Sequence, residues 1–216
     1  MEVLSYLTTA VAAYLLGSIP TGFLVAQAKG IDIRSVGSGN IGATNVFRIL
    51  GKPAGIFVLA ADALKGWLAV AVMPGLVFSI FGLSPDHQAR EFYAILAGVL
   101  AVLGHNYTCW LYFKGGKGIA TSAGALVALV PWALLIILTV WLVLFVFTRY
   151  VSLGSLAASF TLPFATFLTT GSATLTAAAG AMGALAIYKH KANIKRLLNG
   201  TETRISFKGK EGAPCR

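Results

Sequence analysis

Long apolar stretches alternate along the chain with short polar segments. A membrane-spanning helix requires about 20 residues, and six stretches meet that length: residues 3–28, 53–83, 92–110, 131–148, 152–170 and 172–188. The first of them contains Pro20, which favours a break in the helix. A shorter apolar stretch, residues 119–130, follows a glycine-rich loop, and we interpret it as a seventh, partly re-entrant crossing. The pattern predicts an all-α, polytopic membrane helix bundle that forms one domain over residues 1–216.

Composition agrees with a membrane protein, because 57% of the 216 residues are hydrophobic and 11% are charged. Soluble domains carry about 25% charged residues. The 17 Lys and Arg outnumber the 7 Asp and Glu, a balance that in a soluble protein would suggest nucleic acid. In a membrane protein the same excess marks cytoplasmic loops. We therefore expect membrane lipid, and no nucleic acid, as the surroundings and partner of this chain.

The positions of the basic residues predict the orientation. With the N-terminus outside and seven crossings, every Lys and Arg except Lys65 and Arg90 falls in an inner segment; these segments are 29–52, 108–118, 149–151 and the tail 189–216. Without the short crossing, the basic tail would lie opposite the first two basic loops. The positive-inside rule therefore predicts seven crossings, with the N-terminus outside and the C-terminus inside.

The first polar block is residues 35–48, SVGSGNIGATNVFR. Its glycines allow the chain to expose successive N–H groups, and we expect Ser38 or Asn40 to cap a following helix. A helix N-terminus of small residues suits an anion, and Arg48 would add a guanidinium that pairs with phosphate oxygens. An ordinary capped turn with a surface arginine is the alternative interpretation.

The second polar block, residues 113–124, contains Lys114-Gly115-Gly116-Lys117-Gly118 before another apolar helix. It does not match the Walker A pattern. Unhindered backbone amides, a lysine charge and a hydroxyl nevertheless favour phosphate binding over a merely positive inner loop.

The third block, residues 189–202, places His190 and Asn193 on one face of a helix that leaves the membrane. His190 would donate to a phosphate or act as an acid or base. An interfacial helix with snorkelling basic side chains is the alternative. We expect Glu202 to hold the tail by ion pairing.

Two ionisable residues, Asp62 and Lys65, interrupt an apolar stretch at a spacing that allows them to pair on one helix face. Charges in a span are functional candidates, although a self-neutralising structural pair explains them equally well. His105, at the end of another stretch, is expected to face the second block. The two cysteines, Cys109 and Cys215, are far apart and indicate neither a disulfide framework nor a zinc site. We expect no metal and no cofactor.

Taken in order, these blocks resemble the bacterial membrane glycerol-3-phosphate acyltransferases that use acyl phosphate as donor. The resemblance covers essentially the whole chain and rests on GSIPTG (17–22), SGNIGATNVFR, DALKG (62–66), GH (104–105), FKGGKGIAT, RYVSLGS (149–155) and HKANIKRLLNGTE. One departure follows His105, where the family usually carries a proline and this chain has Asn106-Tyr107-Thr108-Cys109.

The resemblance implies transfer of a fatty acyl group from acyl phosphate to the 1-hydroxyl of glycerol 3-phosphate. The products would be lysophosphatidic acid and phosphate, made in phospholipid biosynthesis at the cytoplasmic face of a bacterial inner membrane. It implies catalytic roles for Ser38, Arg48, Lys117, His190 and Asn193. We expect substrate contacts from Gly39, Asn40, Thr44, Asn45, Gly115, Gly116, Gly118, Thr121, Lys65 and His105, and structural roles for Asp62 and Glu202. An acyl-phosphate-producing enzyme is an expected partner.

The chain contains no His–Asp pair of the HxxxxD kind that acyl-CoA-type acyltransferases use as a base. Acyl phosphate is already activated, so positioning and charge neutralisation would suffice, and the leaving phosphate would accept the hydroxyl proton. A transporter or channel for small anions would also use basic loops and helix ends. It predicts phosphate counterflow without a lipid product. A purely structural membrane protein is the third alternative, and it predicts that the loop residues are replaceable.

Overall fold

The computed structural model describes residues 1–205, and every regular element within them is a helix. The prediction of an all-α fold is confirmed for this part of the chain, whereas Cys215 and the rest of the expected inner tail beyond residue 205 lie outside the described residues. The elements are α1 (Glu2–Ser18), α2 (Thr21–Gln27), α3 (Ala43–Leu50), α4 (Lys52–Ala71), α5 (Met73–Phe81), α6 (His87–Asn106), η1 (Cys109–Leu111), α7 (Ile119–Leu129), α8 (Pro131–Thr148), α9 (Val151–Thr170), α10 (Ala173–Lys189) and α11 (Lys191–Leu198).

Two of the apolar stretches are broken into consecutive helices. The expected break at Pro20 is present, and it separates α1 from α2. A second break, which the pattern did not predict, separates α4 from α5 at Val72. Pro74 lies in the first turn of α5, where a missing N–H costs little, and it cannot continue the hydrogen-bond ladder of α4.

Five stretches of the described residues are long and apolar enough to cross a membrane: Glu2–Gln27, Lys52–Phe81, His87–Leu111, Pro131–Thr148 and Val151–Thr170. The stretch expected over residues 172–188 forms α10, which has 17 residues. The short crossing expected over 119–130 forms α7, an 11-residue helix. Helix α8 exposes large apolar side chains on most of its surface, including Trp132 and Val146, as expected for a helix that faces lipid tails.

Glycines bring several helix pairs into backbone contact. A Cβ atom added to Gly17 of α1 would overlap the backbone of Ala101 in α6, and one added to Gly66 of α4 would overlap the carbonyl of Thr121 in α7. Similar close contacts join Gly104 to the backbone of α1, Gly124 to that of α4 and Gly183 to that of α9. Helices in lipid associate largely through such close packing of small residues. The contact of α7 with α4 fixes the position of the loop before α7.

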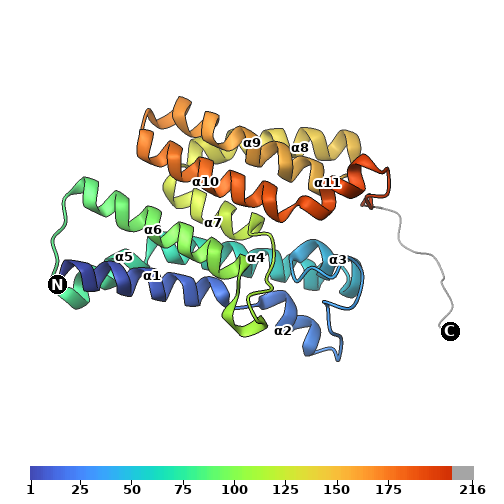
Figure 1. Cartoon of the computed structure of the whole chain (residues 1–216), viewed down its shortest axis with the longest axis horizontal. Coiled ribbons are helices and arrows are strands. Elements are labelled where there is room, and N and C mark those ends of the chain that lie inside the picture. Colours follow the sequence, from blue (N-terminus) through green and yellow to red (C-terminus); the bar gives the residue numbers. More distant parts are fainter. Residues whose placement is uncertain (206–216) are drawn as a thin grey trace.

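The shorter helices gather at one end of the bundle (Figure 1). Helices α2, α3 and α11 lie at the end opposite the N-terminus of α1, and the loop that leads into α7 also turns there. Helices α8, α9 and α10 form one group, α1, α4, α5 and α6 form another, and α7 lies between them. All three polar blocks of the sequence therefore reach the same end of the molecule.

Candidate active site

The first loop is shaped by Asn45, whose side chain is buried beneath it. Its Nδ2 lies 3.2, 3.1 and 2.9 Å from the carbonyl oxygens of Ile33, Val36 and Asn40, and its Oδ1 accepts a 2.9 Å hydrogen bond from the N–H of Ser38. These contacts occupy the amide, so Asn45 holds the loop in shape from below. They also leave the side chain of Ser38 on the exposed side of the loop.

The expected cap of the following helix by Ser38 or Asn40 is wrong. Helix α3 begins at Ala43, its N-cap is Gly42 in an extended conformation, and no side chain caps it. The Oδ1 atom of Asn40 instead accepts a 2.9 Å hydrogen bond from the N–H of Gly42. This bond closes a tight turn just before the helix, of the kind that Asn side chains commonly form.

The second loop folds back onto the end of α6. The N–H of Gly115 donates to the carbonyl of Asn106 at 3.2 Å, and the N–H of Gly116 donates to the carbonyl of His105 at 3.0 Å. A Cβ on either glycine would overlap atoms of His105, so the prediction that His105 faces this block is confirmed. Because both N–H groups already have partners, these glycines serve close packing, and the amides that remain to face a ligand begin at Lys117.

Gly118 ends the second loop with a φ of +79°, a conformation that glycine adopts without strain, and acts as the N-cap of α7. Thr121 follows in the first turn and is fully buried where α7 meets α4. The hydroxyl of Thr121 and the side-chain amide of Asn106 have no hydrogen-bond partner among residues 1–205. The unpaired amide of Asn106 lies against Gly118, and the unpaired hydroxyl of Thr121 lies three residues further along the chain.

His190 is buried at the junction of α10 and α11, where its Nδ1 lies 2.7 Å from the carbonyl oxygen of Ala186. A carbonyl only accepts, so Nδ1 carries the proton and Nε2 is the acceptor nitrogen. Burial and the nearby ammonium of Lys117 lower the pKa of His190 to about 4. At neutral pH the ring is therefore uncharged, and it accepts a hydrogen bond at Nε2 in preference to donating one to a phosphate.

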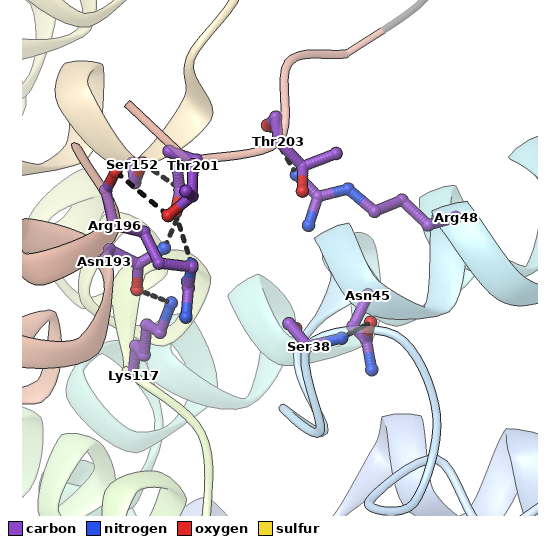
Figure 2. Close-up of polar contacts among 10 residues, drawn as sticks. Ser38, Asn45, Arg48, Lys117, Ser152, Asn193, Arg196, Thr201 and Thr203 are labelled. Atoms are coloured by element: carbon purple, nitrogen blue, oxygen red, sulfur yellow. Dashed lines mark hydrogen bonds and ion pairs between the residues drawn. The ribbon is translucent and has the colours of Figure 1, made fainter. Parts of the chain in front are cut away.

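A polar network joins the second and third blocks (Figure 2). The ammonium of Lys117 donates to Oδ1 of Asn193, and Nδ2 of Asn193 donates to Glu202 at 2.7 Å. Ser152 of α9 and Arg196 of α11 also donate to the Glu202 carboxylate, each at 2.7 Å. The ion pair expected of Glu202 is thus present, with Arg196. Ser152 was not among the expected residues, and its only signal was its place in the RYVSLGS segment.

Arg48 brings the first block to the same place. Figure 2 shows its side chain extending toward Thr203, whose carbonyl oxygen lies 3.1 Å from its Nη2 atom. Burial lowers the pKa of Arg48, Glu202 raises it and Arg196 lowers it. Burial, followed by the charge of Arg196, lowers the pKa of Lys117 to about 8; Glu202 opposes this shift and Arg48 adds to it. The three polar blocks, which the charge pattern assigned to inner segments, therefore meet in one cluster.

Beside this cluster lies a cavity of about 310 Å³, lined by Asn40, Tyr107, Gly115, Gly116, Lys117, Tyr188, Lys189 and Lys191. Lys189 donates to the carbonyl of Asn106 at 2.8 Å and lies 4.2 Å from the centre of the Tyr107 ring. Lys191 lies 5.0 Å from the centre of the Tyr188 ring. Sequence reasoning missed these four residues, because it assigned the lysines to a solvated interfacial helix. The aromatic–basic sequence YKHK was the available signal.

Asp62 and Lys65 form the pair that their spacing predicted. Both are buried in α4, with 2.9 Å between Asp62 Oδ1 and Lys65 Nζ. The ammonium of Lys65 also lies 2.9 Å from the carbonyl oxygen of Ile19 and 2.9 Å from Nδ1 of His105. His105 in turn contacts Gly116, and neither Lys65 nor His105 lines the cavity.

Comparisons with known proteins identify the family. Residues 7–200 match the family model described as glycerol-3-phosphate acyltransferase. Proteins of that name from Desulforamulus reducens and Clostridioides difficile are 46% and 44% identical, over 92% and 96% of this chain and 94% and 99% of their own lengths. The crystal structure of PlsY, an integral membrane glycerol 3-phosphate acyltransferase in its glycerol 3-phosphate form, is 40% identical with a TM-score of 0.82, covering 94% of this chain and 96% of that one. Its lysophosphatidic acid form gives a TM-score of 0.80.

Proposed function

The chain belongs to the glycerol-3-phosphate acyltransferase family, and we propose that its acyl donor is a fatty acyl phosphate. The 1-hydroxyl oxygen of glycerol 3-phosphate attacks the acyl carbonyl carbon, and the bond from that carbon to the phosphate oxygen breaks. The products are lysophosphatidic acid and inorganic phosphate. The observation that carries the proposal is the convergence of Arg48, Lys117 and Arg196 around one carboxylate, beside a cavity.

Three cations against the single carboxylate of Glu202 leave the site with an excess of positive charge. Such a site neutralises a leaving phosphate dianion at the moment that its charge develops, which lowers the barrier without a strong base. Lys117, Arg48 and the amides from Lys117 to Thr121 hold the phosphate groups. Gly118 allows those amides to turn toward the ligand.

The first loop contributes contacts on the other side of the cavity. Asn40 of this loop lines the cavity, Ser38 is exposed on the same loop, and Gly39 and Thr44 are partly exposed. We assign these residues to substrate binding, and Asn45 to holding their loop. Ser38 acts by hydrogen bonding in a direct transfer, so no acyl-enzyme forms on it.

His190 and Asn193 orient the reactants rather than remove the proton. A neutral imidazole with a pKa of about 4 is a weak base, and we assign to its Nε2 the role of accepting a hydrogen bond from the attacking hydroxyl. Asn193 positions the ammonium of Lys117 through its Oδ1. The hydroxyl proton passes to the phosphate oxygen that leaves the acyl carbon, so dianionic acyl phosphate departs as the monohydrogen phosphate dianion and no separate base is required.

We also propose how the single domain of residues 1–216 is placed in the membrane. Seven crossings, with the N-terminus outside and the C-terminus inside, bring the site to the cytoplasmic face of a bacterial inner membrane. The gathering of α2, α3 and α11 at one end of the bundle supports this placement. An enzyme that produces acyl phosphate would deliver the donor to that face, and the acyl chain would enter from the lipid.

The test is a reaction of the purified protein with palmitoyl phosphate and glycerol 3-phosphate, without CoA, followed by detection of lysophosphatidic acid and phosphate. Parallel reactions with palmitoyl-CoA and palmitoyl-acyl carrier protein decide the donor. We expect product from acyl phosphate, loss of turnover in Lys117→Met, and full turnover in Lys29→Met, an exposed lysine outside the site. Lysophosphatidic acid formed from palmitoyl-CoA but not from palmitoyl phosphate, or an acyl group trapped on Ser38, would overturn the proposal. Phosphate counterflow in sealed vesicles without a lipid product would indicate a transporter instead.

A further inference from the structure

Three buried ionisable side chains form a continuous chain from α4 to the second loop. Asp62, Lys65 and His105 are 2%, 4% and 5% exposed. Asp62 Oδ1 lies 2.9 Å from Lys65 Nζ, and Lys65 Nζ lies 2.9 Å from His105 Nδ1. Neutralising a charge within an apolar span requires one partner only. The third member therefore calls for a separate explanation.

The donor and acceptor roles within this chain determine the tautomer of His105. An ammonium donates hydrogen bonds and accepts none. The carboxylate of Asp62, 2.9 Å away, stabilises the charged form of Lys65, which also donates to the carbonyl of Ile19. Nδ1 of His105 lies 2.9 Å from this donating ammonium and 3.7 Å from the Asp62 carboxylate, beyond hydrogen-bond distance, so Nδ1 is the acceptor and the ring proton resides on Nε2. This is the reverse of His190, in which Nδ1 is the donor.

The Nε2 edge of His105 touches the second loop. It occupies the space that a Cβ atom on Gly116 would take, and the carbonyl of the same histidine accepts the N–H of Gly116 at 3.0 Å. His105 therefore contacts this glycine through both its ring and its main chain. The next residue is Lys117, whose ammonium enters the charged cluster.

We propose that Asp62, Lys65 and His105 are positioning residues, which hold His105 in its Nε2–H tautomer and so set the place of Gly116 and Lys117 in the phosphate-binding loop. This inference rests on the proposed function, because it assigns the loop to a phosphate group. Lys65 and His105, which we expected to contact the substrate, would instead act through the loop. The proposal also explains why the charged pair of α4 lies against His105 at the end of α6.

The first test reads the tautomer directly and does not depend on turnover. Nitrogen-15 NMR of the histidine-labelled protein distinguishes a protonated ring nitrogen from an unprotonated one. We expect protonated Nε2 in His105 and protonated Nδ1 in His190, which serves as the internal reference. Lys65→Met should abolish the preference in His105 and leave His190 unchanged. A wild-type His105 protonated at Nδ1, or a tautomer that Lys65→Met does not alter, would overturn the proposal.

The second test separates positioning from a merely structural role. His105→Phe keeps a ring against Gly116 but removes both nitrogens, whereas His105→Gln keeps an N–H donor near the position of Nε2. We expect His105→Phe to lower kcat/KM by about 10- to 100-fold, mainly through a higher KM for acyl phosphate, because a small displacement of a binding group has effects of that size. His105→Gln should recover most of the loss.

His87→Phe, at the exposed start of α6, is the matched control and should behave as wild type. Unchanged KM in His105→Phe, with activity reduced only in proportion to a smaller folded fraction, would refute the positioning role; so would equal damage in His105→Gln. If wild-type protein makes no lysophosphatidic acid from acyl phosphate, the proposed donor fails, and the NMR measurement still decides the hydrogen-bond chain.

Discussion

The displaced pKa of Lys117 predicts a loss of activity above pH 8. Burial and the charge of Arg196 lower this pKa to about 8 from 10.5. A group with that pKa is about 90% charged at pH 7 and about 10% charged at pH 9. If the ammonium is what binds the phosphate, kcat/KM falls by about tenfold over those two pH units. The profile of kcat should change less, because a bound phosphate keeps the lysine protonated.

Two other sources of a pH effect can be separated from this one. Phosphate groups have a second pKa of about 6, so glycerol 3-phosphate is already a dianion across the range from pH 7 to 9. A pH-dependent loss of folded protein caused by the titration of Lys117 would not produce this decline, because the effect of Lys117 on stability has the opposite sign. Between pH 8 and 10.5 the unfolded chain binds this proton and the folded chain does not, so the contribution of Lys117 to stability rises with pH.

The assay is initial-rate formation of lysophosphatidic acid from pH 6.5 to 9.5 at constant ionic strength, corrected for spontaneous hydrolysis of acyl phosphate. Lys117→Arg is the matched variant, because a guanidinium stays charged throughout this range. We expect a lower but pH-independent kcat/KM in this variant between pH 7 and 9. A flat profile in the wild type, or the same decline in Lys117→Arg, would refute the assignment of the phosphate to this ammonium.

Three further outcomes are expected. Gly118→Ala should lower the Tm in detergent more than Gly30→Ala does. Both positions have a positive φ, where a side chain costs about 1–2 kcal/mol, but only a Cβ on residue 118 would meet neighbouring atoms. Equal shifts in Tm would contradict this packing. Glu202→Gln should cost about 1–3 kcal/mol by removing the charge that faces Arg196, and it should move the alkaline loss of activity to lower pH, as pH profiles and thermal unfolding would show. In an NMR titration His190 should remain neutral down to a pH of about 4, and titration near 6.5 would contradict its burial.

Hydrophobic pattern and charge placement predicted most of the architecture. Uninterrupted apolar runs mark the helices, since neither a strand edge nor an irregular segment is stable in lipid. The distribution of Lys and Arg assigned the segments of Arg48, Lys117 and His190 to one side of the membrane, and the structure gathers these segments although they are far apart in sequence. Both predictions depend on properties that each segment carries by itself, which is why a single sequence was sufficient.

The details that were missed depend on contacts between distant segments. Ser152 contacts Glu202 because the chain after α11 returns to the start of α9, where the N–H of Ile205 donates to the carbonyl of Arg149, and nothing local to Ser152 signals that contact. The carbonyl of Thr203 meets Arg48 only because the chain turns back after α11. The break at Val72 was missed because it lies in a run of uniformly apolar residues. Pro74, which follows it, occupies the first turn of α5, where a helix tolerates proline. Local patterns cannot distinguish such alternatives.

The glycine contacts between helices have a consequence for engineering this enzyme. Replacing helical glycine by alanine is a common route to thermostable variants, because it restricts the unfolded chain and gains about 0.4–1 kcal/mol. At Gly17, Gly66 or Gly124 the added methyl group would force two helices apart. Gly75 of α5 has open space where the methyl group would lie, and it is the site at which a designer should begin.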